Sequence, residues 1–154
     1  MREAFDAMRT GFDHGAGLRP FGAVVARAGV VIAKATNTCG RDCDPTAHAE
    51  INAIRMAARS RNSLDLSDCV LVASAQPCPM CRAAAFHAGI RTIAYASCWS
   101  DYRDLFADQA CFEELRADPD PRSWLSTHHH AAALSIWQDY RQSLLDHHNT
   151  THQS

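Results

Sequence analysis

The stretch Asp44-Pro45-Thr46-Ala47-His48-Ala49-Glu50 places an imidazole and a carboxylate two residues apart. A second stretch, Pro77-Cys78-Pro79-Met80-Cys81, adds two thiols three residues apart. Read together, they give His-x-Glu followed by Pro-Cys-x-x-Cys. These side chains are the kinds that bind transition metals and move protons, so the rest of the chain is interpreted around them.

A zinc site accounts for both stretches. Zinc prefers four tetrahedral ligands from nitrogen and sulfur, and a catalytic zinc leaves the fourth position to water. We expect His48, Cys78 and Cys81 to supply three ligands to one Zn²⁺ per chain. Two thiolates and one neutral imidazole cancel the charge of the metal, so a base should help to remove the proton of the water. Glu50, two residues from His48, is the candidate for this base.

Other interpretations exist for each stretch alone. A Cys-x-x-Cys pair is also typical of a redox pair or of half a structural zinc site, and His-x-Glu occurs by chance. Both patterns are present here, each beside a proline. A structural site would need a fourth protein ligand and would leave Glu50 without a role. We therefore favour a catalytic zinc.

The two thiols are expected at the start of a helix. Cys78 and Cys81 are three residues apart and so share one helix face. Pro77 and Pro79 suit a helix start, where a missing N–H costs little. The unpaired N–H groups at such a start also stabilise thiolates.

The spacing of His48 and Glu50 also predicts a helix start. Two residues apart on a regular helix, these side chains would point to opposite sides. They address one site only near the beginning of a helix or at a turn. We expect the helix to begin with Asp44 as N-cap and Pro45 in first position, with Thr46 as a rival cap.

Composition limits the class of protein. A chain of 154 residues with 47% hydrophobic residues predicts one domain over 1–154 with a proper core. No apolar run reaches the length of a membrane helix, and residues 1–6 do not begin a signal peptide. Seven cysteines are an odd number, and without an export signal they indicate reduced thiols and metal ligands. We infer a cytoplasmic protein.

Charge argues against a nucleic-acid partner. The formal net charge is −2, and Lys34 is the only lysine in the sequence. There is no basic run of the kind that follows a phosphate backbone. We therefore do not expect nucleic acid as substrate.

Hydrophobic periodicity predicts alternating helices and strands. Before residue 97 the expected helices cover 3–14, 47–59 and 78–87, and the expected strands cover 21–26, 30–35, 69–74 and 91–96, with a hairpin turn at 27–29 and a polar loop at 37–43. The order helix, strand, helix, strand implies parallel neighbours joined by right-handed crossovers. Both site helices then start at the same edge of the sheet. Further helices are expected over 102–115 and 131–146.

Several polar residues keep two interpretations. Asn37 is a turn residue or an amide that reads a base. Cys39 and Cys43 are ordinary thiols rather than a second metal site, because no further ligand pair accompanies them. The run His128-His129-His130 is expected to be a solvated cluster rather than a metal site.

The two site stretches carry a family resemblance. His-x-Glu followed by Pro-Cys-x-x-Cys is the signature of zinc nucleobase deaminases. With residues 20–25, 44–54 and 77–81, the chain resembles the cytidine-deaminase-like superfamily and, within it, the small bacterial guanine deaminases. This resemblance implies an α/β fold, a three-layer α/β/α sandwich around a five-stranded mixed sheet. It also implies a homodimer in which the C-terminal helix, 131–146, is exchanged between subunits.

The resemblance also implies roles for residues near the metal. It makes His48, Cys78 and Cys81 the zinc ligands and Glu50 the proton shuttle. Asp108 aligns, across a gap of one residue, with an acidic residue that serves guanine deaminases as a second proton carrier. Its alternative is an aspartate on a helix surface.

The base contacts follow in the same way. The resemblance makes Asn37 the amide that binds the base carbonyl, Phe21 the stacking residue and the Ala49 backbone N–H a contact of the base edge. His87 occupies the position of an aromatic residue that packs by the pocket, and Gln76 replaces a glutamate. These two departures bear on which base is preferred.

The leading functional hypothesis is hydrolytic deamination of a free base, guanine to xanthine plus ammonia. Deamination of cytosine or a triazine base is an alternative. Another is tRNA adenosine deamination, although residues 141–154 hold no lysine and one arginine. A zinc-stabilised base-binding protein is the non-enzymatic alternative, and Glu50 argues against it.

Overall fold

The computed structural model describes residues 1–12, 16–102 and 105. All of them belong to the unit Met1–Leu115, so a single domain over 1–154 stays a prediction. The expected C-terminal helix at 131–146, Asp108 and the run His128-His129-His130 lie outside the described residues. In the described ranges, no helix has the length and apolar character needed to cross a membrane.

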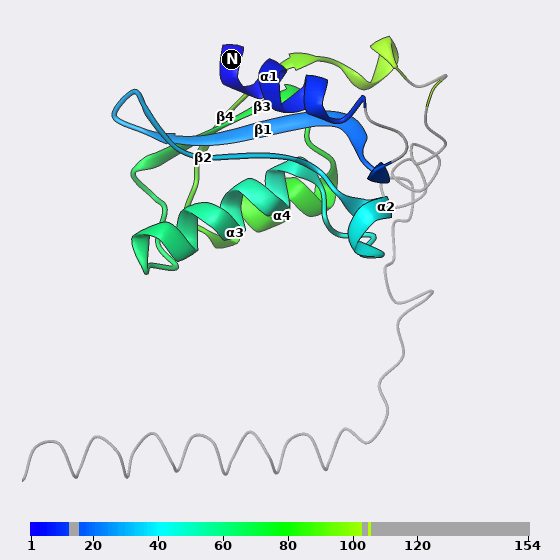
Figure 1. Ribbon diagram of the computed structural model, residues 1–154. Helices are drawn as coiled ribbons and strands as arrows, with labels where there is room; N and C mark the ends of the chain where they lie inside the picture. Colours follow the sequence, from blue (N-terminus) through cyan, green and yellow to red (C-terminus); the bar gives the residue numbers. More distant parts are fainter. Residues whose placement is uncertain (13–15, 103–104, 106–154) are drawn as a thin grey trace, which may run out of the picture. The chain divides into compact units, whose positions relative to one another are not determined.

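A mixed sheet carries the described part of the chain (Figure 1). Strand β1 pairs antiparallel with both β2 and β3, and β3 pairs parallel with β4, in the order β2-β1-β3-β4. The strands are β1 (Arg19–Arg27), β2 (Val30–Asn37), β3 (Cys69–Ala75) and β4 (Thr92–Ser97). The expected alternation and the parallel pair are confirmed. The expected number of five strands is corrected to four for the described ranges.

The turn between β1 and β2 follows the sequence. Ala28 and Gly29 both have positive φ, 48° and 81°, and Arg27 pairs with Val30 across them. A two-residue turn of this kind matches the right-handed twist of the strands it joins. The predicted hairpin is confirmed.

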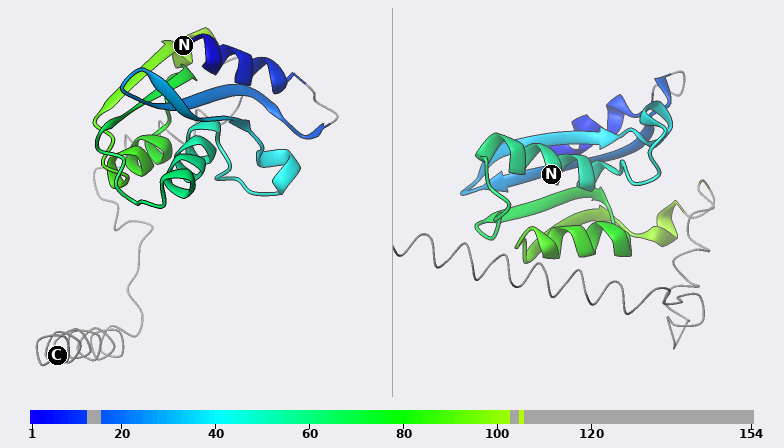
Figure 2. Two further views of the ribbon diagram at one scale, coloured as in Figure 1. Left: turned by 60° about the vertical axis from the view of Figure 1, so that its left-hand side comes forward. Right: turned by 90° about the horizontal axis from the view of Figure 1, so that it is seen from below.

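Helices cover the sheet on both faces. Helix α1 (Arg2–Thr10) lies on one face, and α3 (Ala49–Arg61) and α4 (Pro79–His87) lie on the other, as Figures 1 and 2 show from three sides. Gly22 permits the close approach of α1, because a Cβ there would lie 2.1 Å from the Ala4 carbonyl oxygen. The α/β/α sandwich is therefore confirmed.

The core lies mainly between the sheet and α3 and α4. Its members are small and aliphatic residues that expose less than a tenth of their surface, among them Ala23, Val25, Ala53, Ala57, Leu66, Leu71, Ala85 and Ile90. Alanines on α3 allow its backbone to lie close to the strands. This packing fixes the two helices that carry the site.

Two local expectations are wrong. Helix α1 ends at Thr10 with Gly11 as its C-cap instead of continuing to 14, and a Cβ at Gly11 would lie 2.0 Å from the Arg19 carbonyl oxygen. The polar segment 37–43 contains a short helix, α2 (Cys39–Asp42), that ends at Cys43 with φ 49°. A one-turn helix leaves no hydrophobic period in the sequence, so the pattern did not reveal it.

The start of α3 also differs from the expectation. The helix begins at Ala49 with His48 as N-cap, and not at Asp44 or Thr46. The Asp44 Oδ1 atom instead accepts hydrogen bonds from the backbone N–H and the hydroxyl of Thr46, both at 2.7 Å. Such an Asx turn uses the same aspartate that would otherwise cap a helix.

Candidate active site

Two helix starts meet at the predicted metal site. His48 is the N-cap of α3, Glu50 lies in the first turn of α3, and Cys78 is the N-cap of α4. N-cap residues have extended backbone, so their side chains face the open first turn. The prediction that His48 and Glu50 lie at the start of a helix is confirmed, four residues later than expected.

The three candidate ligands have the separations that zinc requires. The His48 Nδ1 atom lies 3.5 Å from the Cys81 Sγ atom and 3.7 Å from the Cys78 Sγ atom. A tetrahedral zinc with bonds of about 2.3 Å to sulfur and about 2.05 Å to nitrogen holds such atoms about 3.6 Å apart. All three ligand atoms lie within 4.8 Å of one another. The donor set and its geometry therefore fit Zn²⁺.

The two thiols share their protons unequally. Hydrogen bonds from the Cys81 thiol, from His48 and from the Cys81 backbone N–H lower the pKa of Cys78 to about 4, against the effect of burial. The contact with Cys78 raises the pKa of Cys81, as does burial. Cys78 is therefore the sulfur that loses its proton first, and bound zinc would displace the proton of Cys81 as well.

Glu50 is a buried carboxyl beside this group. Its side chain is 7% exposed. Burial raises the pKa of Glu50, the nearby imidazole of His48 lowers it, and the charge of Cys78 raises it. A carboxyl whose pKa is raised accepts and returns a proton more readily at neutral pH than an exposed one.

Asn37 lies at the end of β2 and is buried, with 2% of its surface exposed. Its Oδ1 atom accepts the Cys39 backbone N–H at 3.1 Å, so its amide oxygen takes part in a turn. Ala49 is fully buried and is the first residue of α3, where a backbone N–H has no acceptor within the helix.

Asn52 fixes the end of β2 to the start of α3. Its Nδ2 atom lies within hydrogen-bond distance of the Thr36 carbonyl oxygen (3.1 Å), the Thr38 hydroxyl (3.0 Å) and the Ala47 carbonyl oxygen (3.2 Å). The Thr38 backbone N–H donates to the Ala47 carbonyl as well. The segments that carry Asn37 and His48 are therefore bound to each other.

Aromatic side chains lie near the metal group and at the start of β1. Phe21 meets Tyr102 edge to face, with ring centroids 5.5 Å apart and planes at 67°. Trp99 packs against the cluster of Ile51, Cys78 and Cys81. Burial raises the pKa of Tyr102, and the charges of Glu50 and Cys78 raise it further, which places the phenol near the site.

Sequence analysis did not identify Trp99 and Tyr102. The signal was present, because Trp99 and Tyr102 lie two and five residues after the end of β4, and β4 is parallel to β3, which ends three residues before Cys78. Residues that follow neighbouring parallel strands meet at one edge of a sheet.

One predicted site residue, His87, lies away from this group. His87 is exposed in the last turn of α4, while Cys78 caps its start. Nine residues of helix, at about 1.5 Å each, separate the two ends by roughly 13 Å. Asp108 lies outside the described residues.

Comparisons with known proteins agree with this geometry. The family model described as the cytidine and deoxycytidylate deaminase zinc-binding region matches residues 1–97. The guanine deaminase of Bacillus subtilis (strain 168) is 33% identical over 126 residues, which cover 79% of this chain and 81% of that protein. The X-ray structure of guanine deaminase from Bacillus subtilis has a TM-score of 0.75 at 31% identity and covers 90% of each chain.

Two further relatives are named as deaminases of different substrates. The tRNA-specific adenosine deaminase of Aquifex aeolicus (strain VF5) is 44% identical over 62 residues, which cover 40% of this chain and 41% of that one. The structure of guanine deaminase from Nitrosomonas europaea has a TM-score of 0.60 at 31% identity, and covers 66% of this chain and 58% of its own.

Proposed function

This chain belongs to the cytidine and deoxycytidylate deaminase zinc-binding family, and from this premise we propose that it hydrolyses free guanine to xanthine and ammonia. As a member it is a zinc-dependent hydrolase of C–N bonds that deaminates a nucleobase and holds one zinc ion per chain. Guanine as the base is the specific part of the proposal.

The breadth of the likeness to a guanine deaminase supports this choice of base. The Bacillus subtilis enzyme is matched over 79% of this chain, whereas the Aquifex aeolicus tRNA deaminase is matched over 40%. Asn37 and Ala49 are both buried, and a small free base would suit a site that such residues line.

The proposed reaction adds water to the amino-bearing carbon of the base and releases ammonia. Zinc, held by His48, Cys78 and Cys81, would act as a Lewis acid that makes the attacking water more acidic. Glu50 takes a proton from that water as the C–O bond forms. It passes this first proton to the ring nitrogen. It then takes the second proton, from the newly formed C–OH group, and delivers it to the amine as the C–N bond breaks, so that one water is consumed and one ammonia leaves.

The remaining residues orient the base in this proposal. The Asn37 amide nitrogen donates to the base carbonyl, since its amide oxygen is engaged with Cys39. The Ala49 backbone N–H meets the base edge, and Phe21 with Tyr102 supplies an aromatic surface. Asp108, if it reaches the amine, would be the second proton carrier that the resemblance implies.

Ammonia release from free bases tests the proposal. The panel is guanine, cytosine, adenine, isoguanine, ammeline and 8-azaguanine, each with and without a chelator. We expect release from guanine that the chelator abolishes. Turnover of a pyrimidine or triazine alone would retain the reaction and overturn the choice of guanine.

Substitution of Glu50 tests its role separately. Glu50→Gln keeps the size of the side chain and removes the proton acceptor, so we expect kcat to fall at least about 10²-fold. The zinc content, measured on the same sample, should stay at one ion per chain. Wild-type turnover in this variant would reject the proton-shuttle role.

A tRNA adenosine deaminase is the second candidate, favoured by the 44% identity over 62 residues to the Aquifex aeolicus enzyme. Incubation with tRNA and analysis for inosine distinguishes it from the first. Inosine without xanthine formation would establish this alternative.

The homodimer, the exchange of 131–146 and the cytoplasmic location remain proposals of the same kind. The six described cysteines are free thiols, as a reduced compartment requires. Light scattering of the zinc-loaded chain gives its mass in solution, and a mass of one chain would reject the dimer.

A further inference from the structure

A hollow lies on the described part of the chain, where α3 meets β2 and α2. It has a volume of about 420 Å³ and contains neither Glu50 nor any of the three zinc ligands. Three arginines line it, Arg41 from α2 and Arg55 and Arg59 from α3. We call it the arginine groove.

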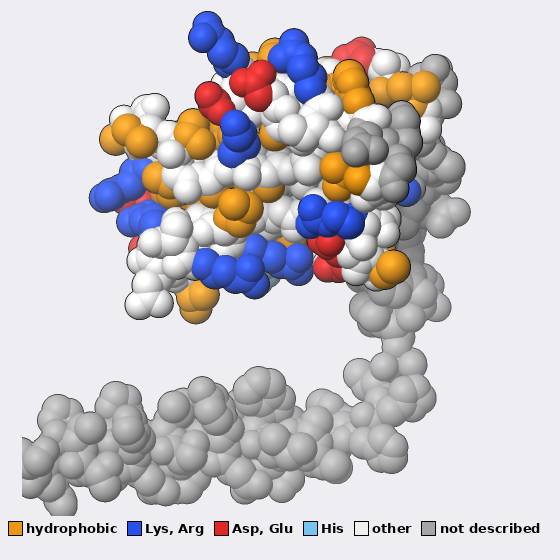
Figure 3. Space-filling model, viewed as in Figure 1, with side chains coloured by type: hydrophobic (Ala, Val, Ile, Leu, Met, Phe, Trp, Pro, Cys, Tyr) orange, Lys and Arg blue, Asp and Glu red, His pale blue; other side chains and the backbone are white. Residues whose placement is uncertain are grey.

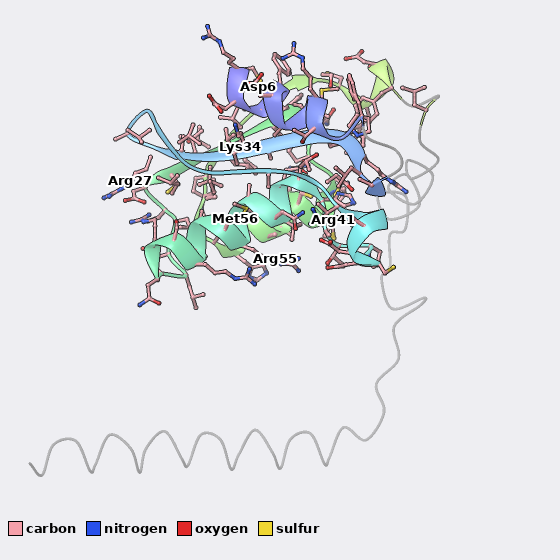
Figure 4. The ribbon with its side chains drawn as sticks, in the orientation of Figure 1. Asp6, Arg27, Lys34, Arg41, Arg55 and Met56 are labelled. Carbon is pink, nitrogen blue, oxygen red and sulfur yellow. The ribbon has the colours of Figure 1, made fainter. Side chains whose placement is uncertain are left out.

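The three guanidinium groups leave the arginine groove positive. Arg55 and Arg59 are four residues apart and so project from one face of α3. Asp42 pairs with Arg41 at 2.7 Å, and Asp44 lies 3.6 Å from Arg55. Among the described residues, Arg59 has no carboxylate partner. Figure 3 shows Lys and Arg side chains over this part of the face, and Figure 4 labels Arg41 on α2 and both Arg55 and Met56 on α3.

Polar groups line the remainder of the arginine groove. Thr36, Thr38 and Asn52 contribute hydroxyl and amide groups. Asp42 also lines the groove, and its carboxylate is paired with Arg41. Hydroxyls and amides donate hydrogen bonds to phosphate oxygens, and guanidinium groups bind them through two parallel N–H donors. The side chains that line the arginine groove therefore suit an anionic phosphate group better than an uncharged ligand.

We propose that the arginine groove binds the phosphate group of a small metabolite of about the size of a nucleoside monophosphate. Its volume falls in the range of small-ligand sites, about 300–1,000 Å³. Two other described cations are paired with carboxylates, Lys34 with Glu3 at 2.8 Å and Arg27 with Asp68 at 2.6 Å. Over the described residues, this pairing argues against a continuous positive track for a nucleic-acid backbone.

The arginine groove also contacts the segments that form the base site. Asn52 lines the groove and at the same time donates to the Thr36 and Ala47 carbonyl oxygens. Thr38, the neighbour of Asn37, lines it too and binds Asp42 through its hydroxyl at 2.6 Å. A bound phosphate would compete for these donors, so we infer that occupancy alters the affinity of the base site.

Binding to the zinc-loaded full chain tests the site without reference to catalysis. Calorimetric titration with inorganic phosphate and with guanosine 5′-monophosphate should give saturable binding in the wild type. Arg59→Gln removes a donor that no carboxylate engages, and we expect the Kd to rise about tenfold. Arg2→Gln, exposed on α1 across the sheet, is the matched control and should leave the Kd unchanged.

The possible results separate the alternatives. Absence of saturable binding, or equal weakening in both variants, would overturn the proposal. Binding of an RNA hairpin that Arg59→Gln weakens, without binding of the monophosphate, would assign the surface to nucleic acid instead. For whichever base the enzyme deaminates, we expect added phosphate to change the KM of the wild type. The KM of Arg59→Gln should stay the same with and without phosphate. An unchanged KM in the wild type would refute the coupling.

Discussion

Individual side chains at the metal site owe their chemistry to their place in the first turn of a helix. His48 and Cys78 are N-caps, Glu50 lies two residues after His48, and Cys81 lies three residues after Cys78. A pair at i and i+2 faces one point only where regular helix has not begun. Within a regular helix the two-residue spacing of His48 and Glu50 would point their side chains apart. At the start of the helix the same spacing lets both face the metal site.

Tyr102 is a candidate contact of the base, since its ring packs against Phe21 and its pKa is raised by burial and by the charge of Glu50. An edge-to-face pair contributes about 0.5–1.5 kcal/mol beyond its buried area. We expect Tyr102→Ala to raise the KM of the base about three- to tenfold. Tyr102→Phe, which keeps the ring, should stay within about twofold of wild type. Steady-state kinetics measures both, and an unchanged KM in Tyr102→Ala would exclude Tyr102 from the base site.

At the scale of elements, short polar links hold the site helices in register with the sheet. Asn52 joins β2 and α3, and Asp68 joins the ends of β1 and α3 near the start of β3. Hydrophobic burial fixes which faces pack together, whereas such bonds fix their position along the axis.

Removal of the Asn52 amide should loosen the joint between β2 and α3. Asn52→Ala leaves three acceptors without this donor, and each net hydrogen bond contributes about 1 kcal/mol. We expect the free energy of unfolding to fall by about 1–3 kcal/mol in urea titrations. Arg59→Ala, on an exposed position of the same helix, should change it by less than about 0.5 kcal/mol. Equal stability of the two variants would contradict the structural role of Asn52.

The ion pairs of Asp68 make the stability of the fold depend on pH. Arg61 first, together with a Cys69 contact and Arg27, lowers the pKa of Asp68 to about 2, although burial opposes this. An unfolded aspartate titrates near pH 3.9. The native carboxylate therefore stabilises the fold above about pH 4, and this contribution is lost as the pH falls towards 2.

The variant Asp68→Asn should lack that part of the acid dependence. Thermal unfolding between pH 5 and pH 2 measures it, with Asp6→Asn on exposed α1 as the control. We expect the Tm of the wild type to fall more steeply than that of Asp68→Asn. Parallel curves would show that the ion pairs of Asp68 add nothing to stability.

At the scale of the whole molecule, zinc would join the starts of α3 and α4. These helices lie on the same face of the sheet (Figure 1), and the described chain brings them into contact through Ile51, Cys78 and Cys81. A ligand that binds the folded chain alone stabilises it by mass action. Metal binding and stability are therefore linked.

Removal of the metal should lower the Tm. We expect a fall of at least about 5 °C when a chelator is added to the zinc-loaded chain, because loss of a few kcal/mol of binding shifts the Tm of a domain of this size by this amount. Cys81→Ser, which lacks one thiolate, should start at the lower Tm and not respond to chelator. Cys43→Ser, at an exposed thiol, should behave as wild type. A chelator effect of equal size in Cys81→Ser would mean that the metal binds elsewhere.

The sequence by itself determined the chemistry of this protein. Ligand type and spacing are local properties, so His48, Cys78, Cys81 and Glu50 were identified before any fold was known. The order of helices and strands was also predictable, because burial imposes a period of 3.6 or 2 on the residues of each element.

Only the tertiary structure decided which distant groups meet. Helix α3 begins at Ala49 and not after Asp44, because the Asp44 side chain accepts the Thr46 backbone N–H in a turn. The sequence alone does not decide whether this aspartate forms a turn or caps a helix. Tyr102 and the arginine groove depend on contacts between separate elements. Such contacts follow from packing and register, which no local pattern records.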